Sequence, residues 1–186
     1  ENLTRELRAL TNYAHRELEL WIKEQIYTVR ELSHSKILTE GMSSIGQSSN
    51  KSARQKNFIQ HYLNSVHAKL DTVVGLTAIN TNGQVLASTI DLQNSMSFFQ
   101  NWTETASIQG SVIIPPHWND DHTTAIFSVL VPILSDDDYI LGGLIATFDL
   151  HHIRTYLKDP IKSPLGEVLL LDKDGEIMLS SDGRIQ

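Results

Sequence analysis

The 186-residue sequence contains no cysteine, and this absence removes three kinds of chemistry at once. A chain without a thiol has no disulfide, no thiolate metal site and no cysteine nucleophile. Its five prolines and ten glycines are too few for a low-complexity chain. Its longest apolar runs, residues 125–134 and 139–148, are far shorter than the roughly 20 residues of a membrane-spanning helix. We therefore expect a globular region with no transmembrane segment among these residues.

Basic residues are also scarce. The chain has 15 Lys and Arg against 22 Asp and Glu, for a formal net charge of −7. Nucleic-acid-binding proteins need basic patches that neutralise phosphates, and anionic membrane surfaces attract the same residues. We therefore predict no nucleic-acid partner and do not expect a lipid surface as the main partner.

The motifs of common enzyme classes are missing as well. The sequence has no G-x-S-x-G, no H-E-x-x-H, no phosphate-binding loop and no G-x-G-x-x-G. Three polar stretches, HWNDDH at 117–122, DDD at 136–138 and DKDG at 172–175, lack the ligand spacing of zinc or calcium sites. Polar loops and charged turns explain these stretches better. We therefore predict no catalytic residue, no metal ligand and no cofactor.

One long amphipathic helix is predicted over residues 2–39. Apolar residues recur there at spacings of three or four, and no proline or glycine occurs before Gly41. Such a helix would be about 57 Å long at the standard rise per residue, which exceeds the diameter of a small domain. We expect part of it to project and to form a homodimer with a second copy. A helix packed wholly on its own domain is the alternative.

The rest of the chain has the pattern of an α+β fold. A helix over about 53–70 precedes residues with the two-residue period of strands. We expect a five-stranded, mostly antiparallel sheet with a helix over 95–106 in its longest connection. A short helix over 151–157 and a final hairpin follow, so that helices cover a face of the sheet. The expected strands are 73–79, 84–88, 111–114, 124–131, 139–148, 168–171 and 176–180.

The same hairpin pattern occurs twice. AINTNGQVLAST at 78–89 and LLDKDGEIMLSS at 170–181 each have an apolar lead-in, Asn or Asp before Gly, and a second apolar stretch that ends in Ser. Asn-Gly and Asp-Gly are strong hairpin signals because glycine adopts positive φ without steric cost. We predict that Gly83 and Gly175 lie at two equivalent turns. Because such turns are common, the residues alone leave a chance repeat open.

Taken in order, these segments resemble a double Cache domain, the PAS-like sensor module of bacterial membrane receptors. The resemblance implies two modules strung after one long helix, the second of which opens on the repeated hairpin. It divides the chain into a signalling helix and loop (1–50), a membrane-distal ligand-binding module (51–157), and a linker with the first hairpin of an incomplete membrane-proximal module (158–186). The segments that carry it are the long first helix, LTAINTNGQVLAST, SFFQNW after DLQNS, VIIPPHWND, IFSVLVPIL and GGLIATFDLHHI.

The resemblance also implies a small-molecule site between the sheet and residues 96–122. Family members that bind amino acids contact the charged groups of the ligand with an Arg and an Asp. This sequence has Met96 at the position of the Arg and Thr147 at the position of the Asp. Methionine cannot supply the bidentate, charged contact that Arg makes with a carboxylate. We therefore expect small carboxylates or neutral metabolites rather than α-amino acids.

Aromatic residues of the same region divide into two expected roles. Phe98 and Trp118 are expected to line the pocket, whereas Phe99 and Trp102 are expected in the core. The amino-acid-binding members have a Tyr-x-Asp in this loop. Trp118 stands at the position of its Tyr, and Asp120 stands at the position of its Asp. The complete predicted ligand-binding set is Met96, Phe98, Trp118, Asp120, Ser128 and Thr147.

For function, the resemblance implies the extracytoplasmic sensor domain of a bacterial transmembrane receptor. The domain would lie in the periplasm or the extracellular space, with flanking transmembrane helices in the inner membrane. The cytoplasmic output would be a histidine kinase, a diguanylate cyclase or a chemoreceptor. The chain starts on a helical pattern without Met and ends just after a hairpin, so we expect a piece of a longer protein. The alternatives are a cytoplasmic PAS-like interaction module and, less readily, a small hydrolase or metalloprotein.

Overall fold

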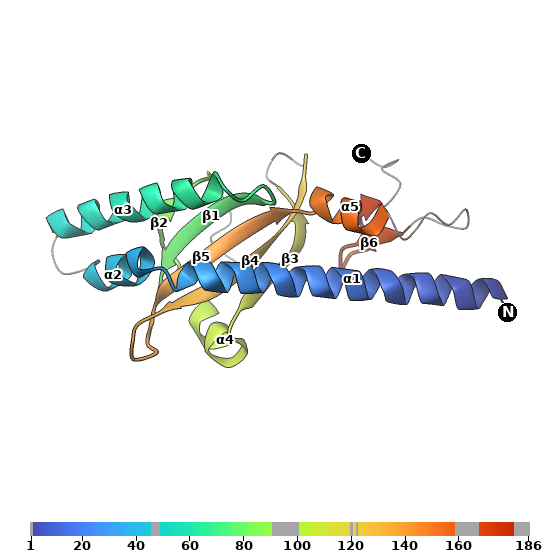
Figure 1. Cartoon of the computed structure of the whole chain (residues 1–186), viewed down its shortest axis with the longest axis horizontal. Helices are drawn as coiled ribbons and strands as arrows, with labels where there is room; N and C mark the ends of the chain where they lie inside the picture. Colours follow the sequence, from blue (N-terminus) through green and yellow to red (C-terminus); the bar gives the residue numbers. More distant parts are fainter. Residues whose placement is uncertain are drawn as a thin grey trace. The chain divides into compact units, whose positions relative to one another are not determined.

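The structure, a computed structural model, describes residues 2–45, 49–90, 101–119, 121, 123–158 and 168–180. These residues have the α+β fold that the sequence predicts, with a long N-terminal helix, an antiparallel sheet and further helices (Figure 1). The chain forms two compact units. The first comprises residues 1–25, 116–127 and 149–186, and the second comprises residues 26–115 and 128–148.

The predicted helix over residues 2–39 is two helices, α1 (Asn2–Ser33) and α2 (Lys36–Ser44). The backbone is extended at Ser35, with φ −60° and ψ 130°. Just before the break, the Ser33 hydroxyl donates to the Arg30 carbonyl at 2.7 Å, and serine side chains compete with helical hydrogen bonds in this way. The prediction of one helix is wrong here because the apolar spacing continues across the break to Leu38, which is fully buried.

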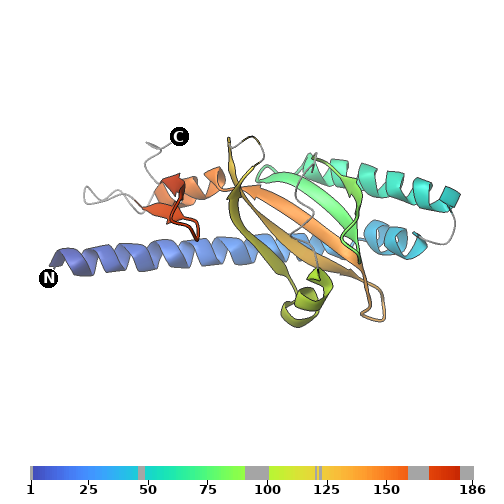
Figure 2. The same cartoon turned by 180° about the vertical axis from the view of Figure 1, so that it is seen from behind.

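Helix α3 (Ser49–His67) packs against α2 and runs along the first two strands. Figures 1 and 2 both show it beside these strands. Gly41 of α2 lies so close to α3 that a Cβ on it would be 3.1 Å from the side chain of Ile59. A residue with a side chain at position 41 would therefore require the side chain of Ile59 to shift by a few tenths of an ångström.

Five strands form one sheet in the order β2-β1-β5-β4-β3. They are β1 (Val73–Asn80), β2 (Val85–Ser88), β3 (Val112–Trp118), β4 (Ala125–Leu134) and β5 (Ile140–Asp149). β1 pairs antiparallel with both β2 and β5. β3 runs farther than predicted, through Pro115 and Pro116. Proline has no backbone N–H to donate, but β3 is an edge strand, and one side of an edge strand needs no hydrogen-bond donors.

Two neighbouring glycines of β5 show which helices cover which face of the sheet. Side chains alternate between the faces along a strand. A Cβ on Gly142 would lie 3.2 Å from the sulfur of Met42 in α2, and a Cβ on Gly143 would lie 3.0 Å from the ring of Trp102. Trp102 begins α4 (Trp102–Gln109). The helices α2 and α4 therefore lie on opposite faces, which we call the α2 face and the α4 face.

Helix α4 is held to the sheet by Trp102 and Ala106, both 2% exposed. It ends at Gly110, which has φ 73°. The predicted helix over 95–106 overlaps α4, although 91–100 lie outside the described residues. The expectation that Trp102 belongs to the core is confirmed, and Phe99 lies outside the described residues. The buried cluster around α4 consists of Ile79, Trp102, Ala106, Ile114, Leu130 and Ile145.

The first unit combines α1 as far as Gln25, the short helix α5 (His151–Lys158) and a two-stranded hairpin, β6 (Leu169–Leu171) and β7 (Ile177–Ser180). The rings of Trp21 and Phe127 pack at 5.2 Å between centroids. A groove of about 320 Å³ opens between α1, α5 and β6. Its lining residues are Leu7, Leu10, Thr11, Ala14, His15, Leu18, Ile153, Val168, Leu169 and Leu170.

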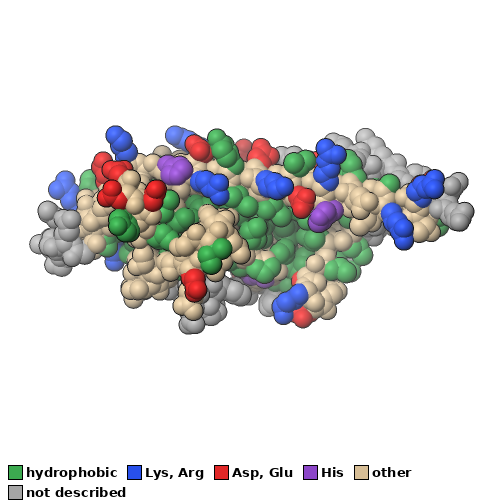
Figure 3. Space-filling model, turned by 90° about the horizontal axis from the view of Figure 1, so that it is seen from below, with side chains coloured by type: hydrophobic (Ala, Val, Ile, Leu, Met, Phe, Trp, Pro, Cys, Tyr) green, Lys and Arg blue, Asp and Glu red, His purple; other side chains and the backbone are tan. Residues whose placement is uncertain are grey.

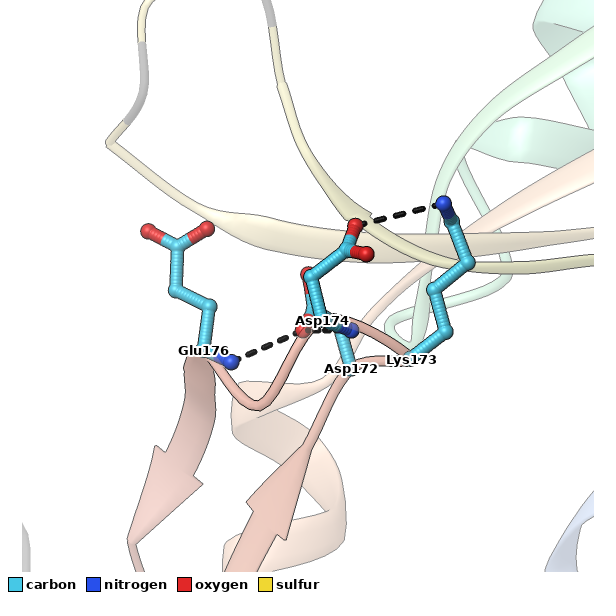
Figure 4. Close-up of polar contacts among 4 residues, drawn as sticks. All are labelled: Asp172, Lys173, Asp174 and Glu176. Atoms are coloured by element: carbon cyan, nitrogen blue, oxygen red, sulfur yellow. Dashed lines mark hydrogen bonds and ion pairs between the residues drawn. The ribbon is translucent and has the colours of Figure 1, made fainter.

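The two repeated hairpins have the same turn. In the second, one carboxylate oxygen of Asp172 accepts the backbone N–H groups of Asp174 at 2.9 Å and Glu176 at 2.8 Å (Figure 4). In the first, the side-chain oxygen of Asn80 accepts the N–H groups of Asn82 at 3.0 Å and Gln84 at 2.9 Å.

The glycines and the register agree as well. Gly83 has φ 79° and Gly175 has φ 85°, so the prediction of two equivalent turns with positive φ is confirmed. The strand pairing also shifts at matching places, between Ala78 and Ile79 in the first hairpin and between Leu170 and Leu171 in the second. The repeat in the sequence is therefore a repeat of structure, down to the irregular step beside each turn.

Candidate functional site

Two hydroxyl pairs lie on the α4 face in the second unit. Ser128 on β4 and Thr147 on β5 are each 5% exposed, and their hydroxyl oxygens are 2.9 Å apart. Thr77 on β1 and Ser88 on β2 form the other pair, with oxygens 2.8 Å apart. Thr147 shares the face of Gly143 because it follows four residues later on the same strand. Gly75 pairs with Thr147 in the register of β1 and β5. Thr77, two residues after Gly75 on β1, therefore lies on the same face.

The hydroxyl hydrogens distinguish the two pairs. Ser88 donates its hydrogen to the carbonyl of Ile90 at 2.7 Å, so the hydroxyl of Thr77 donates to Ser88 and both hydrogens are used. The contact between Ser128 and Thr147 uses only one of their two hydrogens. Among the described residues, the second hydrogen has no acceptor. Because a buried donor without an acceptor costs free energy, this pair is the better candidate for contact with a ligand.

An apolar side chain lies close to this pair. Gly75 is directly opposite Thr147 in the register, and a Cβ on Gly75 would be only 2.6 Å from the side chain of Ile90. Ile90 therefore packs onto the bare backbone of β1, where a larger residue at position 75 would displace it. The hydroxyl pair thus has an apolar neighbour on its β1 side, a combination typical of small-molecule sites.

The strands beneath this face carry almost no charge. β1, β4 and β5 contain a single charged residue, Asp149, at the last position of β5. Its carboxylate accepts the N–H of His151 at 2.7 Å at the start of α5. Nor do the described residues include a group of three His, Asp or Glu side chains that could hold a metal ion. These strands therefore offer a ligand hydroxyl groups and apolar surface, and no ion pair.

Three of the six predicted site residues lie in the described part of the chain. Ser128 and Thr147 are brought together, as shown above. Trp118 ends β3 in the first unit, where it is half-buried, and its indole N–H has no hydrogen-bond partner among the described residues. Met96, Phe98 and Asp120 lie outside the described residues.

Thr77 and Ser88 are not among the site residues that the sequence predicts. A signal for Thr77 exists, because it is the only hydroxyl-bearing residue in the apolar run VVGLTAIN of β1. Its contact with Ser88 could not be foreseen, because that contact depends on the register of β1 with β2.

Comparison of sequences identifies a family for this chain, and comparison of structures identifies proteins with the same fold. A sequence model of the Cache domain matches residues 1–186, the whole chain. The sensor domain of the V. cholerae histidine kinase DctB superposes with a TM-score of 0.70 at 14% identity, covering 97% of this chain and 67% of that chain. A search of curated proteins found no match.

Two chemoreceptors have the same fold. The ligand-binding domain of Campylobacter jejuni Tlp3, solved with 4-methylisoleucine, gives a TM-score of 0.63 at 13% identity over 98% of this chain and 71% of that chain. The ligand-binding domain of the Pseudomonas aeruginosa amino acid chemoreceptor PctC, solved with GABA, gives 0.61 at 13% identity over 98% and 77%. At these identities the likeness concerns the fold alone.

Proposed function

The chain belongs to the Cache domain family, and on this basis we propose that it senses a small molecule on the α4 face for a bacterial transmembrane receptor. Cache domains are extracytoplasmic sensor domains of membrane receptors, and they bind ligands without catalysis. The alternative of a small hydrolase is therefore set aside. Both the ligand of this chain and its signalling role are parts of the proposal.

The observation that carries the proposal is the buried pair of Ser128 and Thr147. Valine or alanine at these positions would bury well among the apolar residues of β4 and β5. Two buried hydroxyls that share one hydrogen bond instead leave a donor without an acceptor among the described residues. A ligand oxygen placed over the pair would accept that hydrogen. The neighbouring Ile90 would contact the apolar part of the same ligand.

The missing charges support a ligand other than an α-amino acid. Tlp3 and PctC were solved with amino acids. On the family pattern alone, amino-acid-binding members have charged residues at the positions of Met96 and Thr147 in this chain. A neutral metabolite or a small carboxylate suits hydroxyl donors and apolar walls better than a zwitterion does. We include Met96, Phe98, Trp118 and Asp120 in the proposed site on the family pattern alone.

The membrane setting belongs to the proposal as well. We propose flanking transmembrane helices in the inner membrane, this domain in the periplasm or extracellular space, and a cytoplasmic output of the kinase, cyclase or chemoreceptor type. No helix in the described part of the chain is both long and apolar enough to span a bilayer. We likewise propose the division at residues 50 and 157, with 158–186 as the beginning of a membrane-proximal module.

We further propose that α1 forms a weak homodimer. Part of the predicted apolar stripe is covered by the chain itself, since Ala14, Trp21 and Val29 are all buried. A second stripe, Tyr13, Leu20 and Tyr27, is exposed by 39%, 51% and 64%. Figure 3 shows hydrophobic side chains exposed between charged groups of both signs on one face of the molecule.

A thermal-shift screen of metabolites tests the proposed site. A ligand at 100 times its Kd should stabilise the domain by about 2.7 kcal/mol. We expect Thr147→Val and Ser128→Ala to abolish most of this stabilisation by the ligand. Ser43→Ala, which removes an exposed hydroxyl bonded to its own helix, is the control and should keep it. A best ligand that is an ordinary amino acid, bound equally well by the two site variants, would refute the site.

A further inference from the structure

A cavity in the second unit lies away from the hydroxyl pairs, between α1, α4 and the turn from β4 to β5. Its volume is about 330 Å³, within the range of small-molecule sites. Its floor is largely apolar, and its rim carries charged groups. We call it the α1–α4 cavity, and its lining residues are Arg30, Ser33, His34, Ala106, Ser107, Gly110, Pro132, Leu134, Asp138 and Ile140.

This cavity is separate from the candidate site on the α4 face. Ser128, Leu130, Pro132 and Leu134 alternate onto the same face of β4. Pro132 lies four residues from Ser128, or roughly 13 Å along a strand. Leu130, between them, belongs to the buried cluster under α4. A molecule in the cavity would therefore not contact the pair formed by Ser128 and Thr147.

Opposite charges line the cavity without neutralising each other. The guanidinium of Arg30 lies beside the end of α4, 3.4 Å from where a Cβ on Gly110 would be. Neither Arg30 nor Asp138 has an oppositely charged group of another described residue within 4.0 Å. His34, just past the end of α1, also lines the cavity.

The backbone at Asp138 lies in a closed turn between β4 and β5. The N–H of Asp138 donates to the Ser135 carbonyl at 3.0 Å, and the N–H of Ser135 donates to the Tyr139 carbonyl at 2.8 Å. Asp138 has φ 61°, a conformation that Asp and Asn adopt more readily than other residues with a side chain. The lining therefore takes its acidic group from the turn between β4 and β5 and its guanidinium, that of Arg30, from α1.

We propose that the α1–α4 cavity binds a small organic molecule with one carboxylate and, at its far end, a hydrogen-bond donor. Arg30 receives the carboxylate, because a guanidinium donates two parallel hydrogen bonds to it. Ala106, Leu134 and Ile140 contact the apolar chain between the two ends. Asp138 accepts from the donor and repels a second carboxylate. This site is independent of the ligand site proposed on the α4 face.

Five four-carbon probes test this chemistry by NMR titration of backbone amides. 4-Hydroxybutyrate and 4-aminobutyrate carry both required ends, and together they distinguish a neutral from a cationic donor. Butyrate lacks the donor, 1,4-butanediol lacks the carboxylate, and succinate places a second carboxylate at Asp138. At least one of the first two should bind saturably, about tenfold tighter than any of the other three. The shifts should centre on Arg30, Ser107, Gly110 and Asp138.

Matched variants assign the two ends. Arg30→Gln should weaken the best probe about tenfold, whereas Arg16→Gln, at an exposed position elsewhere on α1, should leave its Kd unchanged. Asp138→Asn should reduce the preference over succinate, whereas Asp136→Asn in the same turn should not. Ser107→Tyr fills the cavity from an exposed position of α4 and should abolish binding.

Three results would overturn the proposal. The first is the absence of saturable binding by both 4-hydroxybutyrate and 4-aminobutyrate at tens of millimolar. The second is binding that Arg30→Gln weakens no more than Arg16→Gln does. The third is a set of shifts centred on Thr77, Ser128 and Thr147, which would assign the ligand to the α4 face and leave the first proposed site standing.

Discussion

Single residues decide the geometry of this fold at its hairpin turns. Asn80 and Asp172 use the same side-chain oxygen to accept two backbone N–H groups, and the glycine three residues later takes positive φ in both turns. A side chain with a Cβ is strained at that φ whatever the space around it. At Gly175 a Cβ would meet nothing within 4 Å, so the cost there is purely conformational.

We therefore predict a graded response at Gly83, whose hairpin is part of the five-stranded sheet. Gly83→Val should lower the free energy of unfolding by about 1–2 kcal/mol, because a β-branched residue resists positive φ. Gly83→Asn should cost less, because Asn tolerates this conformation. Urea denaturation monitored by circular dichroism measures both values. Equal losses for Val and Asn would mean that crowding, not backbone conformation, makes glycine necessary.

Individual residues also show which features of the fold and the site can be predicted from the sequence and which cannot. The Asn-Gly and Asp-Gly turns are local signals, so both hairpins could be predicted, and the ordered segments were enough to indicate the Cache family. The break at Ser35 could not be predicted, because the apolar spacing runs through it. In the candidate site, Thr147 came from the family pattern, and Ser128 was predicted as a hydroxyl that could orient a polar group of the ligand. The partner of Thr77 required the register of two strands.

At the scale of elements, a side chain from α3 forms hydrogen bonds with the backbone of β2 at the edge of the sheet. The amide of Gln60 accepts the N–H of Ser88 at 3.0 Å and donates to the carbonyl of Ser88 at 2.8 Å. Both backbone groups of Ser88 thus point away from β1, as in a non-hydrogen-bonded antiparallel pair. In such a pair the side chains lie close, which explains the contact of Ser88 with Thr77. Gln60 therefore acts as a one-residue substitute for a sixth strand.

We predict that this contact joins α3 to the sheet energetically. Gln60→Glu keeps the size of the side chain but removes the donor to the Ser88 carbonyl, so it should cost about 1–3 kcal/mol of unfolding free energy. Asn64→Ala removes only the exposed contact between Asn64 and Gln60, and should cost less than about 0.5 kcal/mol. Hydrogen exchange should report faster exchange at the Ser88 amide in Gln60→Glu. An unchanged exchange rate there would show that the contact does not protect the edge.

At the scale of the whole molecule, the open question is what the exposed stripe of α1 contacts. Tyr13, Leu20 and Tyr27 are seven residues apart, which is the repeat of a two-helix seam. Three positions form a short seam, so we expect a dimer only at high protein concentration. A receptor held in a membrane would keep two copies close, and such a weak contact would then suffice.

Sedimentation and crosslinking test this dimer. Leu20→Asp should remove self-association at millimolar protein, because it brings like charges together in an apolar seam. Arg8→Asp lies about 120° around the helix from Leu20 and should have no such effect. Because the chain has no cysteine, Tyr27→Cys provides a single thiol that should crosslink two copies on oxidation, while Arg8→Cys should crosslink poorly. A strict monomer at millimolar concentration, together with equal crosslinking at both positions, would show that the stripe does not pair two copies of α1.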